Sequence, residues 1–176
     1  MLLLLLDSDV IIDLHKFEVW DQITKRHKIH IPSIILHKEV YYYRDQDDKK
    51  CPIDLEGQIG GSIHEISCKA SELLEFSKQF DSVLQQEIHD GEKEALHLIQ
   101  NNQEFLLCTC DRAAIITLAL LDLSDRAISF EKLMRKSGIN VNLEHKHTEE
   151  YFKHFLKKGS IMKIQGTGLR RKKTKR

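Results

Sequence analysis

The sequence predicts an α/β protein with a parallel β-sheet. Short apolar runs of strand length alternate with segments whose apolar residues recur at helical spacing, an order typical of parallel sheets connected by helices. The first run, residues 2–6, is five consecutive leucines, as expected for a central strand buried on both faces. A second run, residues 105–109, ends as the first does, in polar residues and an aspartate. Such strand ends meet at one edge of the sheet, where open α/β sheets bind their ligands.

Composition predicts one globular domain and a basic tail. The chain has 176 residues, of which 41% are apolar and 31% charged, and its formal net charge is zero. That balance conceals an asymmetry, because residues 151–176 contain ten Lys and Arg and no Asp or Glu, whereas residues 1–150 contain 17 basic and 27 acidic side chains. We expect a domain over residues 1–150, followed over 151–176 by a short helix and a basic tail. The tail could contact a polyanion or be a solvated terminus.

Membrane and secretory classes are disfavoured. The leucine run is too short to span a bilayer, and it lacks the basic leader and cleavage site of a signal peptide. The four cysteines lack the CxxC spacing of zinc sites, and Cys108 and Cys110 fall inside an apolar segment. We therefore expect a reduced, cytoplasmic protein with no membrane association.

The first half of the chain predicts two strand–helix units. Residues 10–23 carry apolar side chains at helical spacing behind the leucine run. Residues 27–31 form a short strand stopped by Pro32, and Ser33 is the expected N-cap of a helix over residues 34–43. The charged residues 44–50 end that helix, and Pro52 with the glycines at 57–61 predicts a loop, with a small hairpin there.

The second half of the chain predicts a longer alternation of elements. Gly91 breaks the helical pattern, so that Asp90 can cap the helix that follows it. The expected helices are residues 71–80, 83–88, 92–100, 113–121, 130–136 and a short one near 149–158, and the expected strands are 105–109 and 126–129.

Four carboxylates occur where they could reach one edge of the sheet. Asp7 and Asp111 each follow a strand, and Glu39 lies in the first turns of the helix behind the second strand. Glu94 lies near a helix start and shares a face with Leu98, four residues later. A lone carboxylate at such a position usually caps a helix, but converging carboxylates repel one another without a cation, and Mg²⁺ and Mn²⁺ prefer oxygen ligands. The pattern therefore predicts a metal site.

Four segments together resemble the PIN-domain family: residues 5–12, 31–35 with Glu39, 91–95 and 107–114. This family contains metal-dependent ribonucleases, including many toxins of bacterial toxin–antitoxin pairs, and the resemblance covers about residues 2–145. It implies a three-layer α/β/α fold with a central parallel sheet and an acidic pocket that holds Mg²⁺ or Mn²⁺. The acidic positions of the family, which act in catalysis and metal binding, fall on Asp7, Glu39, Glu94 and Asp111, with Thr109 as a hydroxyl neighbour.

The chain departs from the family pattern at two positions and is ambiguous at a third. Asp9 stands where the family often has asparagine, and it could add a ligand or cap the first helix. Cys110 stands where an acidic or amide residue often precedes the last aspartate. Glu92 competes with Glu94 for the third acidic position; we prefer Glu94, because it directly precedes Ala95 and faces inward.

The resemblance implies a metal-dependent endoribonuclease that leaves a 5′-phosphate and a 3′-hydroxyl. Asp7, Glu94 and Asp111 would hold one metal and Glu39 a second. An acidic pocket repels RNA, so basic residues must supply affinity for the backbone. The candidates are Arg112 beside the pocket and, in the tail, Arg170, Arg171, Lys172 and Lys173. RNA is thus the expected partner, and an antitoxin protein and a second copy of the chain are further candidates.

Three other readings compete with the nuclease. In one, the domain has no catalytic activity and binds RNA or a protein through its tail. In another, Glu94-Ala-Leu-His97 belongs to a carboxylate–histidine metal oxidase, which needs a second Glu-x-x-His that the sequence lacks. In the third, His145 and His147 bind zinc, although no further ligand is apparent.

Overall fold

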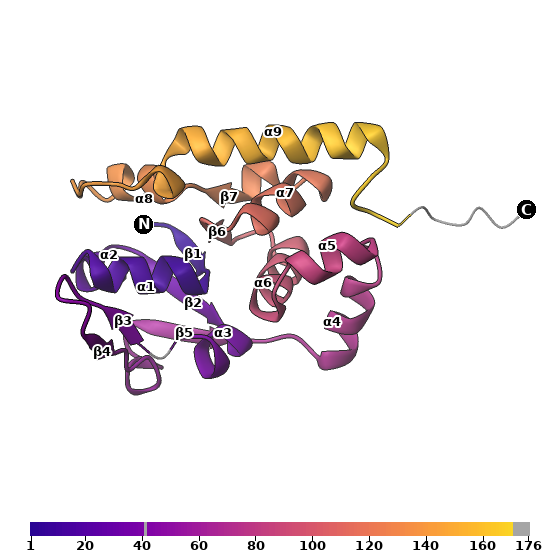
Figure 1. Cartoon of the computed structure of the whole chain (residues 1–176). Helices are drawn as coiled ribbons and strands as arrows, with labels where there is room; N and C mark the ends of the chain where they lie inside the picture. The colour runs from indigo at the N-terminus through magenta and orange to yellow at the C-terminus, as the bar shows by residue number, and fades with distance from the viewer. Residues whose placement is uncertain (41, 171–176) are drawn as a thin grey trace, which may run out of the picture.

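The computed structural model describes residues 1–40 and 42–170. Within these residues five parallel strands form one sheet in the order β5-β2-β1-β6-β7, with helices on both of its faces (Figure 1). The expected α/β class with a parallel sheet is therefore confirmed. The strands are β1 (Leu3–Leu6), β2 (Lys28–Pro32), β5 (Ile63–Ile66), β6 (Leu106–Cys108) and β7 (Ala127–Ile128).

The strand order creates a switch point beside β1. The chain first adds β2 and β5 on one side of β1 and then crosses over to add β6 and β7 on the other. Open α/β sheets bind ligands in the crevice at the carboxyl ends of the strands where the order reverses, which here is between β1 and β6. Leu6 pairs with Cys108 in the register of these two strands, so Asp7 and Thr109 leave the sheet side by side.

The leucine run is divided between two hydrophobic clusters. Leu4 and Leu6 pack on one face of the sheet and Leu5 on the other, because successive side chains of a strand point to opposite faces, and all three are fully buried. The first face is covered by α1 (Ser8–Lys16), α2 (Trp20–Arg26), α3 (Ser33–Lys38) and α8 (Phe130–Lys136), and the second by α4 (Ala70–Ser77), α5 (Ser82–Glu87), α6 (Asp90–Asn101) and α7 (Arg112–Leu120).

The last helix is longer than expected and packs along α7. Helix α9 spans Glu149–Gln165, and Figure 1 shows it running beside α7. Gly159 lets the two helices approach, since a Cβ there would lie 2.3 Å from the carbonyl oxygen of Ile116. After α9 the chain turns back, and Leu169 pairs with Phe80 ahead of α5. Residues 151–170 therefore pack on the body of the domain, and the rest of the expected tail, residues 171–176, lies outside the described residues.

The helix expected over residues 34–43 ends at Lys38. Instead, Tyr42–Arg44 form strand β3, which pairs antiparallel with β4 (Lys50–Pro52) across the charged run. Aromatic residues favour strands, and here the tertiary pairing prevails over the helical spacing. Glu39 consequently lies at the C-terminal end of α3 rather than in its first turns.

Two smaller differences lie near the edge of the sheet. Ser33 does not cap α3, because its hydroxyl donates to a carboxylate oxygen of Glu65 at 2.6 Å. Strand β5 itself was not expected, since the glycines at 57–61 pointed to a loop and its four residues give too short a pattern to recognise. Single turns of 3₁₀ helix occur at Glu56–Gln58, Ser124–Arg126 and His145–His147.

The cysteines are free thiols, and Cys108 and Cys110 are buried. Over residues 1–40 and 42–170, no helix has both the length and the apolarity needed to cross a membrane.

Candidate metal centre

Asp7 follows β1 and is hydrogen-bonded to the end of β6. It caps α1 and has only 2% of its surface exposed. One carboxylate oxygen accepts the backbone N–H of Ser8 at 2.8 Å, and the other accepts the hydroxyl of Thr109 at 2.7 Å. The Thr109 hydroxyl in turn accepts the backbone N–H of Asp111 at 3.0 Å. Thr109 therefore connects the two aspartates that the strand ends predicted, and it orients both.

Asp111 is the N-cap of α7. Its Oδ1 accepts the backbone N–H of Ala114 at 2.8 Å, whereas its Oδ2 makes no hydrogen bond to any residue that the structure describes. A capping carboxylate is favoured by the positive end of the helix dipole. The capping role and a ligand role are compatible here, because each uses a different oxygen.

Glu92 is the third carboxylate beside the strand ends. It lies in the first turn of α6, is 6% exposed, and its Oε2 accepts the backbone N–H of His89 at 2.8 Å. Burial, followed by the nearby charges of Asp7 and Asp111, raises the pKa of Glu92 to about 9. Burial, with Asp9 and Asp111, likewise raises the pKa of Asp7 to about 7. These carboxylates therefore lie close enough to disfavour one another's charge.

Glu39 reaches the same place from the end of α3. Its Oε1 accepts the backbone N–H of Gly91 at 3.1 Å, and a Cβ at Gly91 would lie 2.6 Å from both carboxylate oxygens. Gly91 therefore allows Glu39 to approach the backbone of α6 closely. It does not break the helix, since it lies inside α6, whose N-cap is His89 rather than Asp90. The charge of Glu39 also contributes to the raised pKa of Glu92. We call Asp7, Glu39, Glu92 and Asp111 the acidic cluster.

Glu94 has a different set of partners. It is 3% exposed, as its inward face predicted, but its Oε2 accepts the backbone N–H of Ile34 at 2.8 Å and its Oε1 that of Cys68 at 3.3 Å. Glu92 and Glu94 point about 200° apart around the helix axis. Glu94, the glutamate that the sequence favours for the third acidic position, thus secures the start of α3 and the segment after β5, and Glu92 is the glutamate whose charge interacts with Asp7 and Asp111.

A buried ionic network borders the acidic cluster. Asp13, one turn after Asp9 on α1, accepts the Lys146 ammonium at 2.7 Å and His147 Nε2 at 2.8 Å. The Nδ1 of His147 accepts the backbone N–H of Glu144 at 3.1 Å, which places the proton of a neutral ring on Nε2. Burial alone would raise the pKa of Asp13, but the hydrogen bonds from His147 and Lys146 outweigh it and lower that pKa.

Lys146 extends the influence of this network to Asp9. Burial and the charges of Asp13 and Asp111 raise the pKa of Asp9, and the Lys146 ammonium opposes them. Both ring nitrogens of His147 are used, so the zinc reading of His145 and His147 does not hold. Nothing in the sequence joins residue 13 to residue 147, and only the His-Lys-His run indicated that this turn could matter.

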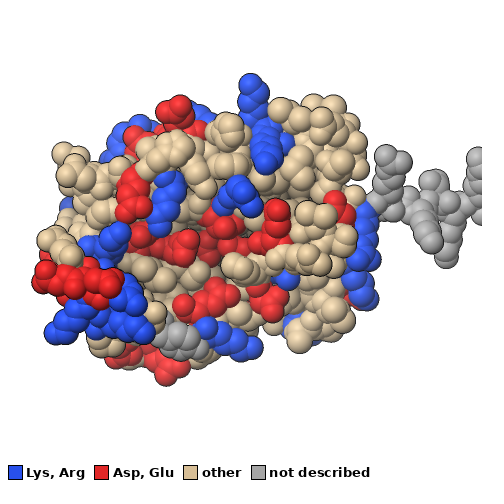
Figure 2. Space-filling view, in the orientation of Figure 1, with Lys and Arg blue, Asp and Glu red and all other residues tan. Residues whose placement is uncertain are grey.

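Basic side chains flank the acidic face. Figure 2 shows a band of Asp and Glu across the middle of this face, with Lys and Arg on either side of it. Arg112 directly follows Asp111, is exposed, and lies 3.9 Å from the carboxylate of Glu87. Arg170 is held through its backbone N–H, which donates to the carbonyl of Gln79. The other expected contacts to RNA, at Arg171, Lys172 and Lys173, lie outside the described residues.

The acidic cluster offers the oxygen ligands that a hard divalent cation prefers. Among the described residues, no three His, Cys, Asp or Glu side chains are already arranged to hold a metal ion. The acidic cluster nevertheless supplies only oxygen donors, and burial together with neighbouring carboxylates raises the pKa of Asp7 and of Glu92, so a cation beside them would favour their charged forms. Such a cation would also relieve the repulsion between these carboxylates, and Oδ2 of Asp111, which makes no hydrogen bond to a described residue, is available as a ligand atom.

Comparison with known proteins adds no relative. No protein-family model matches the chain, and no curated protein and no solved structure matches it at a significant level. Inference of a function therefore depends on the site.

Proposed function

We propose that the protein is a metal-dependent endoribonuclease of the PIN type. The observation that carries the proposal is the acidic cluster: carboxylates from the ends of β1 and β6 and the start of α6 meet at the switch point of a parallel sheet, where burial and neighbouring carboxylates raise the pKa of Asp7 and of Glu92. The order of the four sequence segments resembling PIN domains supports the choice of RNA as substrate.

Each member of the acidic cluster has a role in this proposal. Asp7, Glu92 and Asp111 would hold a Mg²⁺ or Mn²⁺ ion, and Glu39 would reach a second one. When bound, the cation supplies Lewis-acid activation of water and of the phosphodiester. Thr109 orients Asp7 by donating its hydroxyl, so that the carboxylate meets a ligand without rearrangement of the strand ends.

Lys146 would supply positive charge at the edge of the site. Asp13 holds its ammonium, and the buried His147 holds Asp13, so the position of the charge is set by the protein interior. An ammonium beside the carboxylates can attract a phosphate that the acidic cluster would otherwise repel. Lys146 is therefore a positioning residue for the RNA backbone.

A matched pair of substitutions tests the proposal. Glu92→Gln keeps an oxygen for the His89 N–H and removes the charge. Glu94→Gln removes a charge on the same helix away from the acidic cluster, keeping an oxygen for the Ile34 N–H and losing the longer bond from Cys68. With the purified chain and single-stranded RNA in Mg²⁺ or Mn²⁺, we expect Glu92→Gln to lose the cleavage and Glu94→Gln to retain it. Addition of EDTA should abolish cleavage by the wild type.

Two results would contradict the proposal. Metal-dependent cleavage that survives Glu92→Gln would mean that the acidic cluster is not the catalytic site. A wild-type chain that binds RNA but cleaves none in either metal would favour the non-catalytic binding module.

A further inference from the structure

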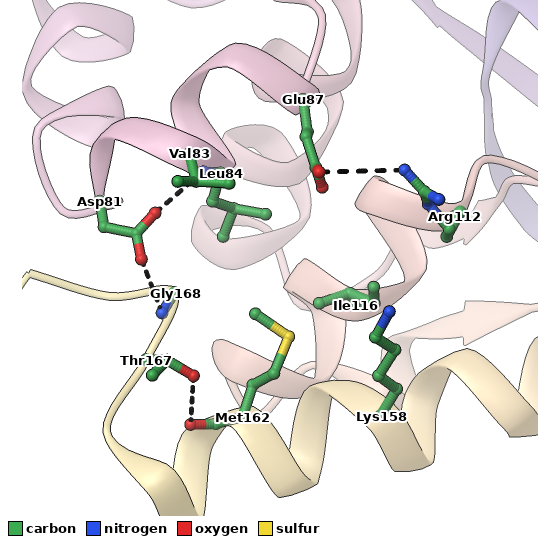
Figure 3. A pocket seen from close by; sticks show the side chains of 10 residues that line it. All are labelled: Asp81, Val83, Leu84, Glu87, Arg112, Ile116, Lys158, Met162, Thr167 and Gly168. Carbon is green, nitrogen blue, oxygen red and sulfur yellow. Dashed lines mark hydrogen bonds and ion pairs between the residues drawn. The ribbon is translucent and has the colours of Figure 1, made fainter.

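A cavity of about 350 Å³ is lined in part by Arg112, the residue that directly follows Asp111 of the acidic cluster. It opens where α5, the start of α7 and the last turns of α9 meet (Figure 3). Leu84, Ile116 and Met162 provide apolar surface inside it, and Val83 at its mouth is 65% exposed. Its volume is near the lower end of the range for small-ligand pockets, about 300–1,000 Å³.

One wall of the cavity is formed by the segment after α9, residues 166–170, which we call the strap. Hydrogen bonds hold the strap against the rest of the domain. The carboxylate of Asp81 accepts the backbone N–H of Leu84 and that of Gly168, both at 2.9 Å, and its own backbone N–H donates to the carbonyl of Gly168. Gly168 has a φ of +84°, and a Cβ there would lie 2.7 Å from Leu120. The cavity is therefore formed before any ligand arrives, which lowers the entropy that binding must overcome.

Two cations stand at the opening. Arg112 comes from the first turn of α7, and Figure 3 shows Lys158 extending from α9 toward Ile116 of α7. Lys158 has no ion pair with any described residue, and the Arg112 pair with Glu87 is long, at 3.9 Å. Asp81 is already occupied by backbone N–H groups, so Glu87 is the remaining acidic side chain of the lining. An anionic ligand with an apolar part suits this lining.

We propose that the cavity binds one nucleotide of single-stranded RNA next to the phosphodiester held at the acidic cluster. The base enters between Leu84, Ile116 and Met162, and its phosphates contact Arg112 and Lys158. Met162 suits this role, because a thioether packs well against a flat ring. The inference rests on the proposed function, since the position of Arg112 directly after Asp111 is what connects the two sites.

The course of the chain favours RNA over a protein segment as the occupant. The strap leads from the cavity wall to Arg170, and the six residues that follow in the sequence include five Lys or Arg. A polyanion gains from the cations at Arg112 and Lys158 and from such a basic sequence, whereas an apolar peptide would gain nothing from them.

The experiment measures binding separately from cleavage. Fluorescence anisotropy with a short labelled single-stranded RNA in EDTA reports affinity for the full chain without turnover. Lys158→Ala is compared with Lys157→Ala, which removes the same charge from the neighbouring position outside the cavity. Val83→Trp, which narrows the mouth without entering the core, is compared with Ser82→Trp.

We expect Lys158→Ala to weaken binding about fivefold at about 0.1 M salt and to reduce the salt slope by about one, as loss of one phosphate contact does. Lys157→Ala should change neither. Val83→Trp should weaken binding of the intact RNA, but not binding of an RNA that lacks the base at the position that occupies the cavity. Ser82→Trp should change the affinity for neither RNA.

Each other outcome has a defined meaning. Equal affinities within both pairs would overturn the inference and would favour a protein segment as the occupant. Cleavage by the wild type with no effect of Lys158→Ala or Val83→Trp on affinity would overturn the inference alone. Weakened binding by both variants in a chain that cleaves no RNA would support the inference and contradict the proposed function.

Discussion

Asp7→Asn should abolish metal-dependent cleavage and at the same time stabilise the metal-free protein. The substitution keeps the size of the side chain and an oxygen for the Ser8 N–H. It removes a charge that burial, Asp9 and Asp111 all disfavour. A gain in stability with a loss of activity is expected where a site holds like charges together for function.

The expected stabilisation follows from the raised pKa of Asp7. Each pKa unit corresponds to about 1.4 kcal/mol, so raising the pKa from 3.8 to about 7 corresponds to about 4 kcal/mol when the carboxyl is ionised in both the folded and unfolded states. Glu92 shares this repulsion and can take up a proton, so we expect about 2 kcal/mol at about pH 8. Between pH 3.8 and about 7 the Asp7 carboxyl binds more protons in the folded state than in the unfolded state. The stability of the wild type therefore falls as the pH rises through this range, and the advantage of the Asp7→Asn variant grows.

Urea unfolding in EDTA at about pH 5 and about pH 8 measures the effect. Asp13→Asn is the matched control, because Asp13 is also buried on α1 but has its pKa lowered by His147 and Lys146. Removing its charge leaves Lys146 and His147 without their partner, so this variant should lose about 2–3 kcal/mol. The two isosteric changes should therefore shift stability in opposite directions.

An Asp7→Asn variant that is no more stable than the wild type at about pH 8 would contradict this prediction. Such a result would mean that burial and the neighbouring carboxylates do not disfavour the charge of Asp7 in the folded protein. Retention of metal-dependent RNA cleavage by the same variant would refute the assigned role of Asp7.

Three further predictions concern two glycines at close contacts and metal binding. Gly91→Ala should destabilise the protein by about 1–3 kcal/mol and reduce cleavage, since the new Cβ displaces Glu39; thermal unfolding and RNA cleavage measure both effects. Gly159→Ala should cost a similar amount with little loss of cleavage below the unfolding temperature, because it separates α7 and α9 away from the acidic cluster. Mn²⁺ affinity, measured by calorimetry, should rise with pH through about 7 to 9 with release of protons, since Asp7 and Glu92 must ionise to bind.

Elements that depend on neighbouring residues in the sequence could be predicted. Asp7 and Asp111 could be brought together because each follows a strand, and the ends of neighbouring parallel strands meet at one edge of the sheet. The bounds expected for α8, Phe130–Lys136, are confirmed, and a glycine follows the helix within two residues. Such elements need only periodicity and caps within a few residues.

The sequence favoured Glu94 over Glu92, whereas the structure places Glu92 beside Asp7 and Asp111. Both side chains are buried in the first turns of one helix, and facing inward does not say toward which neighbour. The packing of α6 decides between them, because one side of the helix meets the strand ends and the other meets the start of α3. The role of Gly91 likewise depends on packing, because this glycine leaves room for Glu39, which lies 52 positions earlier in the chain.

The parallel α/β sheet, most of its helices and the two aspartates at its centre could be predicted from the order of residues alone. Packing of the elements against one another selects the glutamate that joins these aspartates, ends α3 before Glu39, and brings Lys146 and His147 to Asp13 across 133 and 134 positions of chain. The difference lies in the range of the interactions along the chain. Strands, helices and caps arise from neighbours along the chain, whereas these carboxylates are sorted by contacts between elements that only the packed sheet brings together.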